Sequence, residues 1–225
     1  MVRRRKRLSA SAELSGSGQH TWTLAANPYY TRVRDYIDAD PLEPIGGVGM
    51  APGMGAGAMP GGFELIQFTN HSAEIYGADI SGSVRLFNSS TVGKATLEAS
   101  AGWVRGTDLD SGVPLYHMAP LKGRVRLSHA LGSWASRLEV VAADAKTRVD
   151  TVRMEPATPA YTLVNVATGY AWRNLKLELG VDNLFDKAWA QPLGGLSLGD
   201  FAATGMLRPL PGRGRSANLG LTARF

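Results

Sequence analysis

Residues 218–225 read NLGLTARF and alternate apolar and polar side chains up to Phe225. Successive side chains of a β-strand point to opposite faces, so Leu219, Leu221 and Phe225 share one face. The other face carries Asn218 and other small or polar residues. The pattern predicts a strand that is apolar on one side and polar on the other. What covers the apolar side decides which class of protein this is.

The same alternation recurs along most of the chain. In residues 175–182, LKLELGVD, leucines and a valine share one face, while Lys176 and Glu178 lie on the other. Clusters among the 27 Gly and 12 Pro separate the alternating runs. We therefore predict an all-β, antiparallel fold. We expect roughly nine strands, at about residues 8–15, 20–37, 63–87, 94–105, 121–131, 134–148, 161–172, 175–185 and 215–225.

The connections between these predicted strands alternate in length. Short ones fall near 16–19, 88–93, 132–133 and 173–174, and long ones span about 38–62, 106–120, 149–160 and 186–214. A soluble sandwich has no reason to alternate in this way. Outer-membrane barrels have short periplasmic turns and long extracellular loops. The alternation therefore predicts an antiparallel transmembrane β-barrel with its C-terminus on the periplasmic side.

Large aromatic residues lie near the ends of the predicted strands, on the apolar face. They are Trp22, Trp103, Trp134, Trp172 and Phe225. Aromatic girdles occupy these positions in membrane barrels. We therefore expect the outer-membrane lipid as a partner and the bacterial cell outer membrane as the location. The alternative is that these residues are core aromatics of a soluble β-protein.

Composition excludes several other classes. The 225 residues contain no cysteine, which rules out disulfides, a thiolate metal site and a cysteine nucleophile. No run of about 18 apolar residues exists, so no transmembrane helix is expected. The net charge of +5 comes from the opening MVRRRKR, which no apolar segment follows, so we expect neither a signal peptide nor a nucleic-acid partner.

Several stretches, in order along the chain, resemble the barrel of TonB-dependent outer-membrane receptors. GVDNLFDKAW resembles the "NLFD" strand end of that family, and the closing segment is similar to its "PGR" loop and final strand. The resemblance rests on PYYTRVRDYIDA (28–39), NHSAEIYGADISG (70–82), AYTLVNVATGY (160–170), GVDNLFDKAW (180–189) and PGRGRSANLGLTARF (211–225). Asp79 stands where the family more often has Glu.

The resemblance implies a particular domain organisation. Members of the family are 22-stranded barrels whose lumen is plugged by an N-terminal domain. Residues 20–225 are expected to form the C-terminal part of such a barrel, about 9–10 strands, and therefore an incomplete barrel. Residues 1–19 are expected to be a non-native or truncated N-terminus with a partial strand. No plug or TonB box is seen, so we expect a fragment that does not transport alone and meets TonB only through the missing plug.

The resemblance also implies a function and an assembly route. It implies an active transporter for a ferric siderophore or another scarce metal complex, with the metal chelate bound by the plug and the long loops. It further implies that Leu219, Leu221 and Phe225 form the terminal signal for the barrel assembly machinery. Until the barrel closes, that strand is an edge available for pairing.

A second possibility within the family is a copper receptor. Residues 45–62, IGGVGMAPGMGAGAMPGG, form a biased loop with three methionines. Thioethers are soft ligands that select Cu(I). The loop candidates for substrate contact are Met50, Met54, Met59, His71, His117 and Met118. The alternative is a flexible loop in which methionine is simply tolerated, and the sequence leaves the metal open.

The polar face of the predicted strands carries charges of both signs. The predicted lumen charges are Arg124, Arg126, Arg137, Lys176 and Glu178. They would line either a solvated or plug-contacting inner wall, or a basic lumen that attracts anionic ferric chelates.

Enzymatic activity is not expected, and no cofactor is predicted. Asp182 and Asp186 flank Asn183, but at a strand end such residues satisfy the backbone groups of turns. Two further classes stay open: a stand-alone small outer-membrane barrel and a soluble β-rich binding module.

Overall fold

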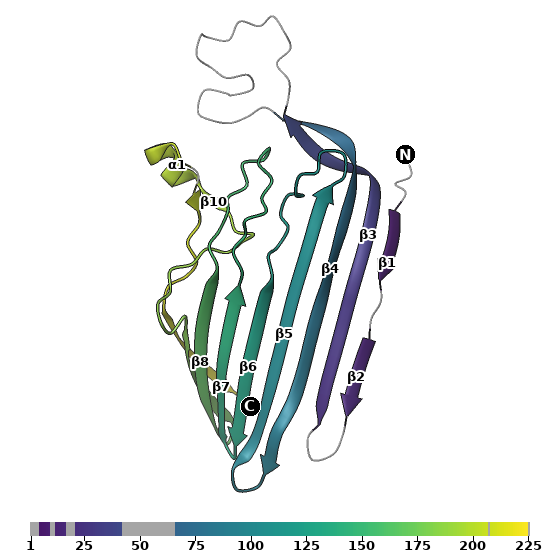
Figure 1. Cartoon of the computed structure of the whole chain (residues 1–225). Coiled ribbons are helices and arrows are strands. Elements are labelled where there is room, and N and C mark those ends of the chain that lie inside the picture. Colours follow the sequence, from purple (N-terminus) through teal and green to yellow (C-terminus); the bar gives the residue numbers. More distant parts are fainter. Residues whose placement is uncertain (1–4, 10–11, 17–20, 42–65, 207, 225) are drawn as a thin grey trace, which may run out of the picture.

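The computed structural model describes the chain except residues 1–4, 10–11, 17–20, 42–65, 207 and 225. Its main feature is one large antiparallel sheet (Figure 1). The strands of this sheet are β1 (Arg5–Ser9), β2 (Ala12–Gly16), β3 (Trp22–Pro41), β4 (Ile66–Ser89), β5 (Gly93–Asp108), β6 (Lys122–Leu131), β7 (Trp134–Ala143), β8 (Tyr161–Trp172), β9 (Leu175–Asp182) and β12 (Ser216–Ala223). The predicted all-β, antiparallel fold is confirmed.

The strands follow one another across the sheet as a meander. The order is β1-β3-β4-β5-β6-β7-β8-β9-β12, with β2 also paired to β3. The pairs Ser9↔Tyr29 and Ala12↔Ala26 keep the same register, so β1 and β2 behave as two parts of one strand. Counted in this way, the observed strands match the nine predicted ones.

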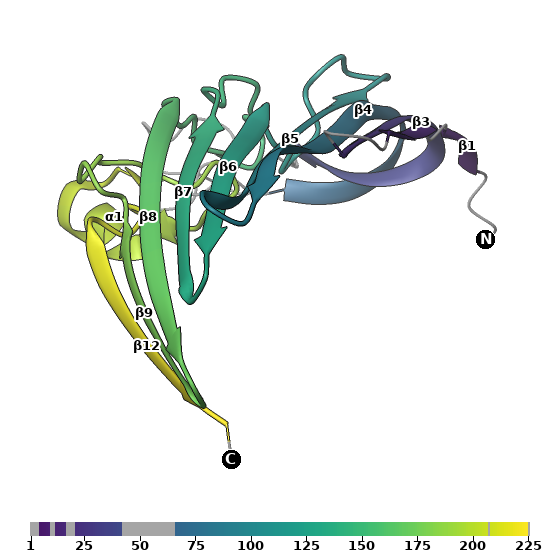
Figure 2. The same cartoon turned by 90° about the horizontal axis from the view of Figure 1, so that it is seen from below.

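The sheet is an open, curved wall. Seen from below, β1 and β12 lie far apart at its two ends (Figure 2). Within the described residues, no pairing joins these two edges. The barrel is therefore not closed by the part of the chain that the structure describes.

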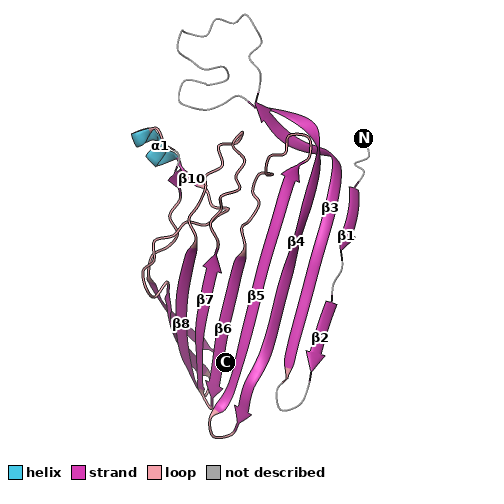
Figure 3. Ribbon diagram, in the orientation of Figure 1, coloured by secondary structure: helices cyan, strands magenta, loops and turns pink. Residues whose placement is uncertain are grey.

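Short and long connections lie at opposite ends of the wall (Figure 3). Residues 90–92, 132–133 and 173–174 make the tight turns, and residues 109–121, 144–160 and 183–215 make the long loops. The turns use left-handed backbone at Gly93 (φ 84°), Gly132 (φ 57°) and Arg173 (φ 51°). The predicted turn near 16–19 and the predicted loop over 38–62 lie largely outside the described residues.

The two faces of the wall differ in chemistry. Cross-strand pairs such as Leu127↔Leu138 and Leu179↔Leu219 build one apolar face. Its leucines are exposed: Leu179 by 50% and Leu219 by 72%. The opposite face carries charges and small polar groups. No helix in the described part of the chain is long and apolar enough to cross a membrane.

Several details differ from the predicted elements, and β7 ends at Ala143 rather than at the predicted residue 148. A bulge between Arg85 and Phe87 puts Phe87, rather than Leu86, opposite Ala95. A second bulge between Val33 and Tyr36 keeps β3 in the sheet up to Pro41, beyond its predicted end. The long loop 183–215 contains structure of its own: β10 (Leu196–Ser197), β11 (Arg208–Pro209) and helix α1 (Leu198–Thr204).

Candidate functional site at the long-loop end

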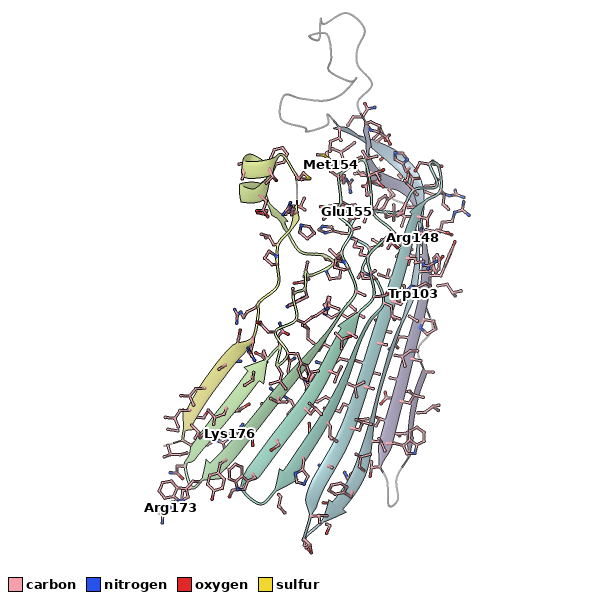
Figure 4. All side chains as sticks on the ribbon, turned by 60° about the vertical axis from the view of Figure 1, so that its left-hand side comes forward. Trp103, Arg148, Met154, Glu155, Arg173 and Lys176 are labelled. Carbon is pink, nitrogen blue, oxygen red and sulfur yellow. The ribbon has the colours of Figure 1, made fainter. Side chains whose placement is uncertain are left out.

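A buried ion pair holds the long loops together. Lys146 Nζ contacts Glu155 Oε1, and each side chain is only 2% exposed. The backbone N–H of His117 donates to Oε1 of Glu155, and that of Asp150 donates to Oε2. Each donor–acceptor distance is 2.9 Å. Lys146 Nζ also donates to the carbonyl oxygen of Pro192, at a distance of 3.3 Å. The pair therefore joins three separate loops; Figure 4 shows Glu155 in this layer, beside Met154.

Arg153 makes a second link between loops and strands. Its guanidinium lies 2.8 Å from Asp38 of β3. It also lies over the rings of Tyr116, at 4.9 Å, and Phe68 of β4, at 5.8 Å. Nearby, burial raises the pKa of the Asp150 carboxyl, although backbone N–H groups of Arg153 and Val152 donate to it and oppose the effect.

A histidine and several aspartates converge where β3 and β5 end and β4 begins. His71 of β4 lies with Nε2 3.1 Å from Asp40 of β3. Its Nδ1 lies 2.9 Å from Asp108, the last residue of β5, and 4.0 Å from Asp110 in the following loop. One donor atom each from His71, Asp108 and Asp110 lie within 4.8 Å of one another, a grouping able to hold a metal ion.

The electrostatics of this cluster favour positive charge on or beside His71. His71 lies five residues from Tyr76, toward the long-loop end of β4, and the Tyr76 ring packs against Trp103. Burial disfavours the charged imidazole, but the hydrogen bond to Asp40 and the carboxylates of Asp108 and Asp40 together raise the pKa of His71.

One network of hydrogen bonds joins the "NLFD" segment to the "PGR" segment. Asn183 is buried, and its side chain both donates to the carbonyls of Lys187 (2.9 Å) and Arg213 (3.3 Å) and accepts from Lys187 N (2.8 Å). Trp189 Nε1 donates to the same Arg213 carbonyl oxygen at a distance of 3.0 Å. A side chain at Gly212 would put Cβ 2.1 Å from the Trp189 ring. This contact explains why glycine occupies that position.

The predicted lumen charges share the polar face of the wall. Arg126 binds Glu139 through two nitrogens, at 2.7 and 3.0 Å, and Lys176 binds Glu178 at 3.0 Å. Arg124 and Arg137 make no ion pair with a described carboxylate. A groove of about 370 Å³ runs over this face. Arg126, Arg137, Lys176 and Glu178 are among its lining residues. The role of these charges stays a prediction.

The structure separates the predicted loop candidates. His71 joins the aspartates described above. The His117 ring stacks on the Tyr116 ring with 4.0 Å between centroids, and His117 does not belong to the group of His71 and aspartates. Met118 Sδ lies against Gly106 of β5. Met50, Met54, Met59 and Phe225 lie outside the described residues. Leu219 and Leu221 lie exposed on the edge strand β12.

Most of the polar residues that organise this end are not marked by any motif in the sequence. Asp40, Asp108, Asp110, Lys146, Arg153 and Glu155 were not singled out. A signal for three of them was present, because IDADP (37–41) and TDLDSG (107–112) each place two aspartates at a predicted strand end beside a long connection.

Comparison with known proteins gives a family match. The family model described as "TonB dependent receptor-like, beta-barrel" matches residues 8–184. A search of the curated proteins finds no match.

Solved structures share the fold. "Copper transporter OprC" is 21% identical, with a TM-score of 0.73, and the match covers 98% of this chain and 32% of that one. The FrpB iron transporter from Neisseria meningitidis is 11% identical, with a TM-score of 0.63 and coverages of 98% and 31%. A mutant of the ferric enterobactin receptor from Pseudomonas aeruginosa is 16% identical, with a TM-score of 0.61 and the same coverages of 98% and 31%. At these identities the likeness shows the fold alone, and the chain spans about a third of each structure's length.

Proposed function

This chain belongs to the TonB dependent receptor-like β-barrel family, and from that premise we propose that it forms part of the wall of an outer-membrane active transporter. Members of this family serve transport rather than catalysis. Residues 20–225 would supply consecutive strands from the C-terminal part of the barrel. The transported cargo would be a metal complex, and TonB would deliver energy through a plug domain.

One observation carries this proposal: the wall is apolar and exposed on one face but charged on the other. Exposed leucines such as Leu177 and Leu221 have no protein layer over them among the described residues. On the opposite face, Arg126 and Glu139 pair with each other. A bilayer outside and water inside account for both faces at once. In lipid, the backbone groups along the edges β1 and β12 must also be paired, so further strands would complete the wall.

The cargo proposal draws on the structural neighbours and on the loops. Two of the three neighbours are described as iron or ferric enterobactin proteins, and the third as a copper transporter. We therefore favour a ferric siderophore, with copper as the second choice. The long loops that would meet the cargo are braced by Lys146, Glu155 and Arg153, as the extracellular layer of a receptor requires. Leu219 and Leu221 of β12 would be read by the barrel assembly machinery.

Site-directed labelling tests the orientation of this wall. The chain has no cysteine, so a single introduced thiol gives an unambiguous signal. Ala202→Cys lies on α1 at the long-loop end, and Ser133→Cys lies in a tight turn; both positions are exposed. A membrane-impermeant maleimide should label Ala202→Cys on intact bacterial cells. It should label Ser133→Cys only after the outer membrane is opened.

Two results would reject the proposal. Equal labelling of both variants on intact cells would remove the sidedness on which it depends. Recovery of the chain in the soluble fraction, with neither thiol protected by a membrane, would show that the apolar face does not meet lipid.

A further inference from the structure

We propose that the ends of β3, β4 and β5 bind one divalent transition-metal ion, of the Zn²⁺ class, through His71 Nδ1, Asp108 Oδ2 and Asp110 Oδ2. This site goes beyond the proposed transport function, because the ion would be a resident of the wall rather than its cargo. It would tie two strands and the loop that follows β5 into one unit.

The surroundings of His71 fix which ring nitrogen is free to bind. Nε2 lies 3.1 Å from Asp40 Oδ2 and 2.6 Å from Thr69 Oγ1, whose own proton goes to Asp40. Asp40 can only accept, so Nε2 carries the proton and donates it. Metal-bound histidines almost always donate their second nitrogen to a carboxylate or carbonyl in this way. In the neutral imidazole, this arrangement leaves Nδ1 without a proton, 2.9 Å from Asp108 Oδ2.

Nδ1 itself has no hydrogen-bond partner. The atom is buried, and the His71 side chain is only 11% exposed. Asp108 Oδ2 is 2.9 Å away, but the contact does not have hydrogen-bond geometry. An unprotonated ring nitrogen this close to a carboxylate oxygen is unfavourable unless a cation binds both atoms.

The two separations measured from His71 Nδ1 are compatible with one bound ion. Zinc bonds to histidine nitrogen and to carboxylate oxygen are both about 2.0–2.2 Å, so two ligand atoms on one ion lie at most about 4.3 Å apart. The separations of Nδ1 from Asp108 and from Asp110, 2.9 and 4.0 Å, meet this limit. Asp110 is 55% exposed, so its side chain is free to complete the fit.

Both carboxylates are already oriented by other groups. Ser111 Oγ donates to Asp108 Oδ2 at a distance of 2.7 Å. The backbone N–H of Ser72 donates to Asp110 Oδ2 at 2.6 Å. Each oxygen keeps a second lone pair for the ion. One imidazole with two carboxylates suits zinc, whereas calcium takes 6–8 oxygen ligands.

Metal titration of the full chain in detergent micelles tests the site. Isothermal titration calorimetry with Zn²⁺ should give one ion per chain, and Co²⁺ should develop the visible absorption of a low-symmetry site. Asp40→Asn should weaken Zn²⁺ binding by about 10–100-fold, the usual effect of losing an outer partner. His71→Ala and Asp108→Asn should weaken it further. His117→Ala is the matched control and should leave binding unchanged.

The exposed variant Asp110→Asn keeps the test valid if a buried variant fails to fold, because it should weaken binding in a folded chain. Absence of stoichiometric binding in the unaltered chain would overturn the proposal and leave a proton as the cation beside His71. Equal binding by the His71→Ala variant would overturn it as well. Neither result bears on the cysteine labelling described above, so the two proposals fail separately.

Discussion

At the scale of single residues, the long-loop end depends on polar side chains whose partners come from distant parts of the sequence. Lys146 and Glu155 are nine residues apart, yet both are buried, and each also binds backbone of another loop. Asn183 plays the same part between the end of β9 and the segment before β12. These contacts set the shape of the loops before any ligand arrives.

Loss of Lys146 should release the loop layer. Lys146→Met keeps much of the side-chain length but leaves the Glu155 carboxylate buried without its cation. Breaking a buried ion pair in this way costs about 3–5 kcal/mol. Limited proteolysis of the folded chain should therefore show much faster cleavage within 144–160. Arg148→Met, an exposed change two residues away, should leave the cleavage rate close to that of the unaltered chain.

Asn183→Ala should destabilise the junction between β9 and β12. The change leaves the Lys187 N–H and the carbonyls of Lys187 and Arg213 without this partner. We expect a loss of about 1–3 kcal/mol, the cost of leaving buried polar groups unpaired. Urea unfolding of the refolded chain measures it. Asn218→Ala removes one exposed hydrogen bond, to Asp182, and an equal loss in that variant would contradict the role given to Asn183.

At the scale of elements, the strands and the alternation of short and long loops could be predicted because both depend on residues that are close in sequence. Alternation in 175–182 is enough to place Leu179 and Glu178 on opposite faces. The bulges at Arg85/Phe87 and Val33/Tyr36 were missed because an extra residue depends on pairing with the neighbouring strand. The His71 cluster was missed because its members come from three elements and meet only after register is set.

The facing of β9 can be tested by one pair of substitutions. Leu179→Arg places a charge on the exposed apolar face and should cost about 2–4 kcal/mol near the middle of the bilayer. Glu178→Arg lies on the polar face and loses the surface pair with Lys176 and the attraction of Arg137, so it should cost far less than Leu179→Arg. Refolding into lipid vesicles measures both values. Similar costs for the two variants would reverse or abolish the facing assignment.

At the scale of the whole molecule, the chain is a wall with very little buried core. The described hydrophobic core cluster comprises only Ala143, Tyr161 and Leu163, with Trp189 packed against it. Stability therefore comes from the ladder of backbone hydrogen bonds between strands, and from whatever covers the leucines. Alternation along the sequence predicts this arrangement, whereas no local pattern encodes the partners of the two sheet edges.

Removal of detergent should aggregate the full chain. Leu177, Leu179, Leu219 and Leu221 are 44–72% exposed on neighbouring strands, and such a contiguous apolar patch associates in water. Sedimentation velocity should show a defined species in micelles and large, heterogeneous particles after dilution. A monomer that persists in plain buffer would rule out a lipid-facing wall.

The length of β4 has a consequence for the proposed placement of the wall in an outer membrane. Its 24 residues extend about 80 Å at roughly 3.3 Å per residue, and a tilt of about 45° still leaves a rise of about 55 Å. The hydrocarbon layer takes up only about 30 Å of that height. If the wall spans the outer membrane as proposed, the paired long-loop ends of β3 and β4 would stand as a ridge above the bacterial surface. Antibodies raised against whole cells should bind this ridge before any other part of the chain.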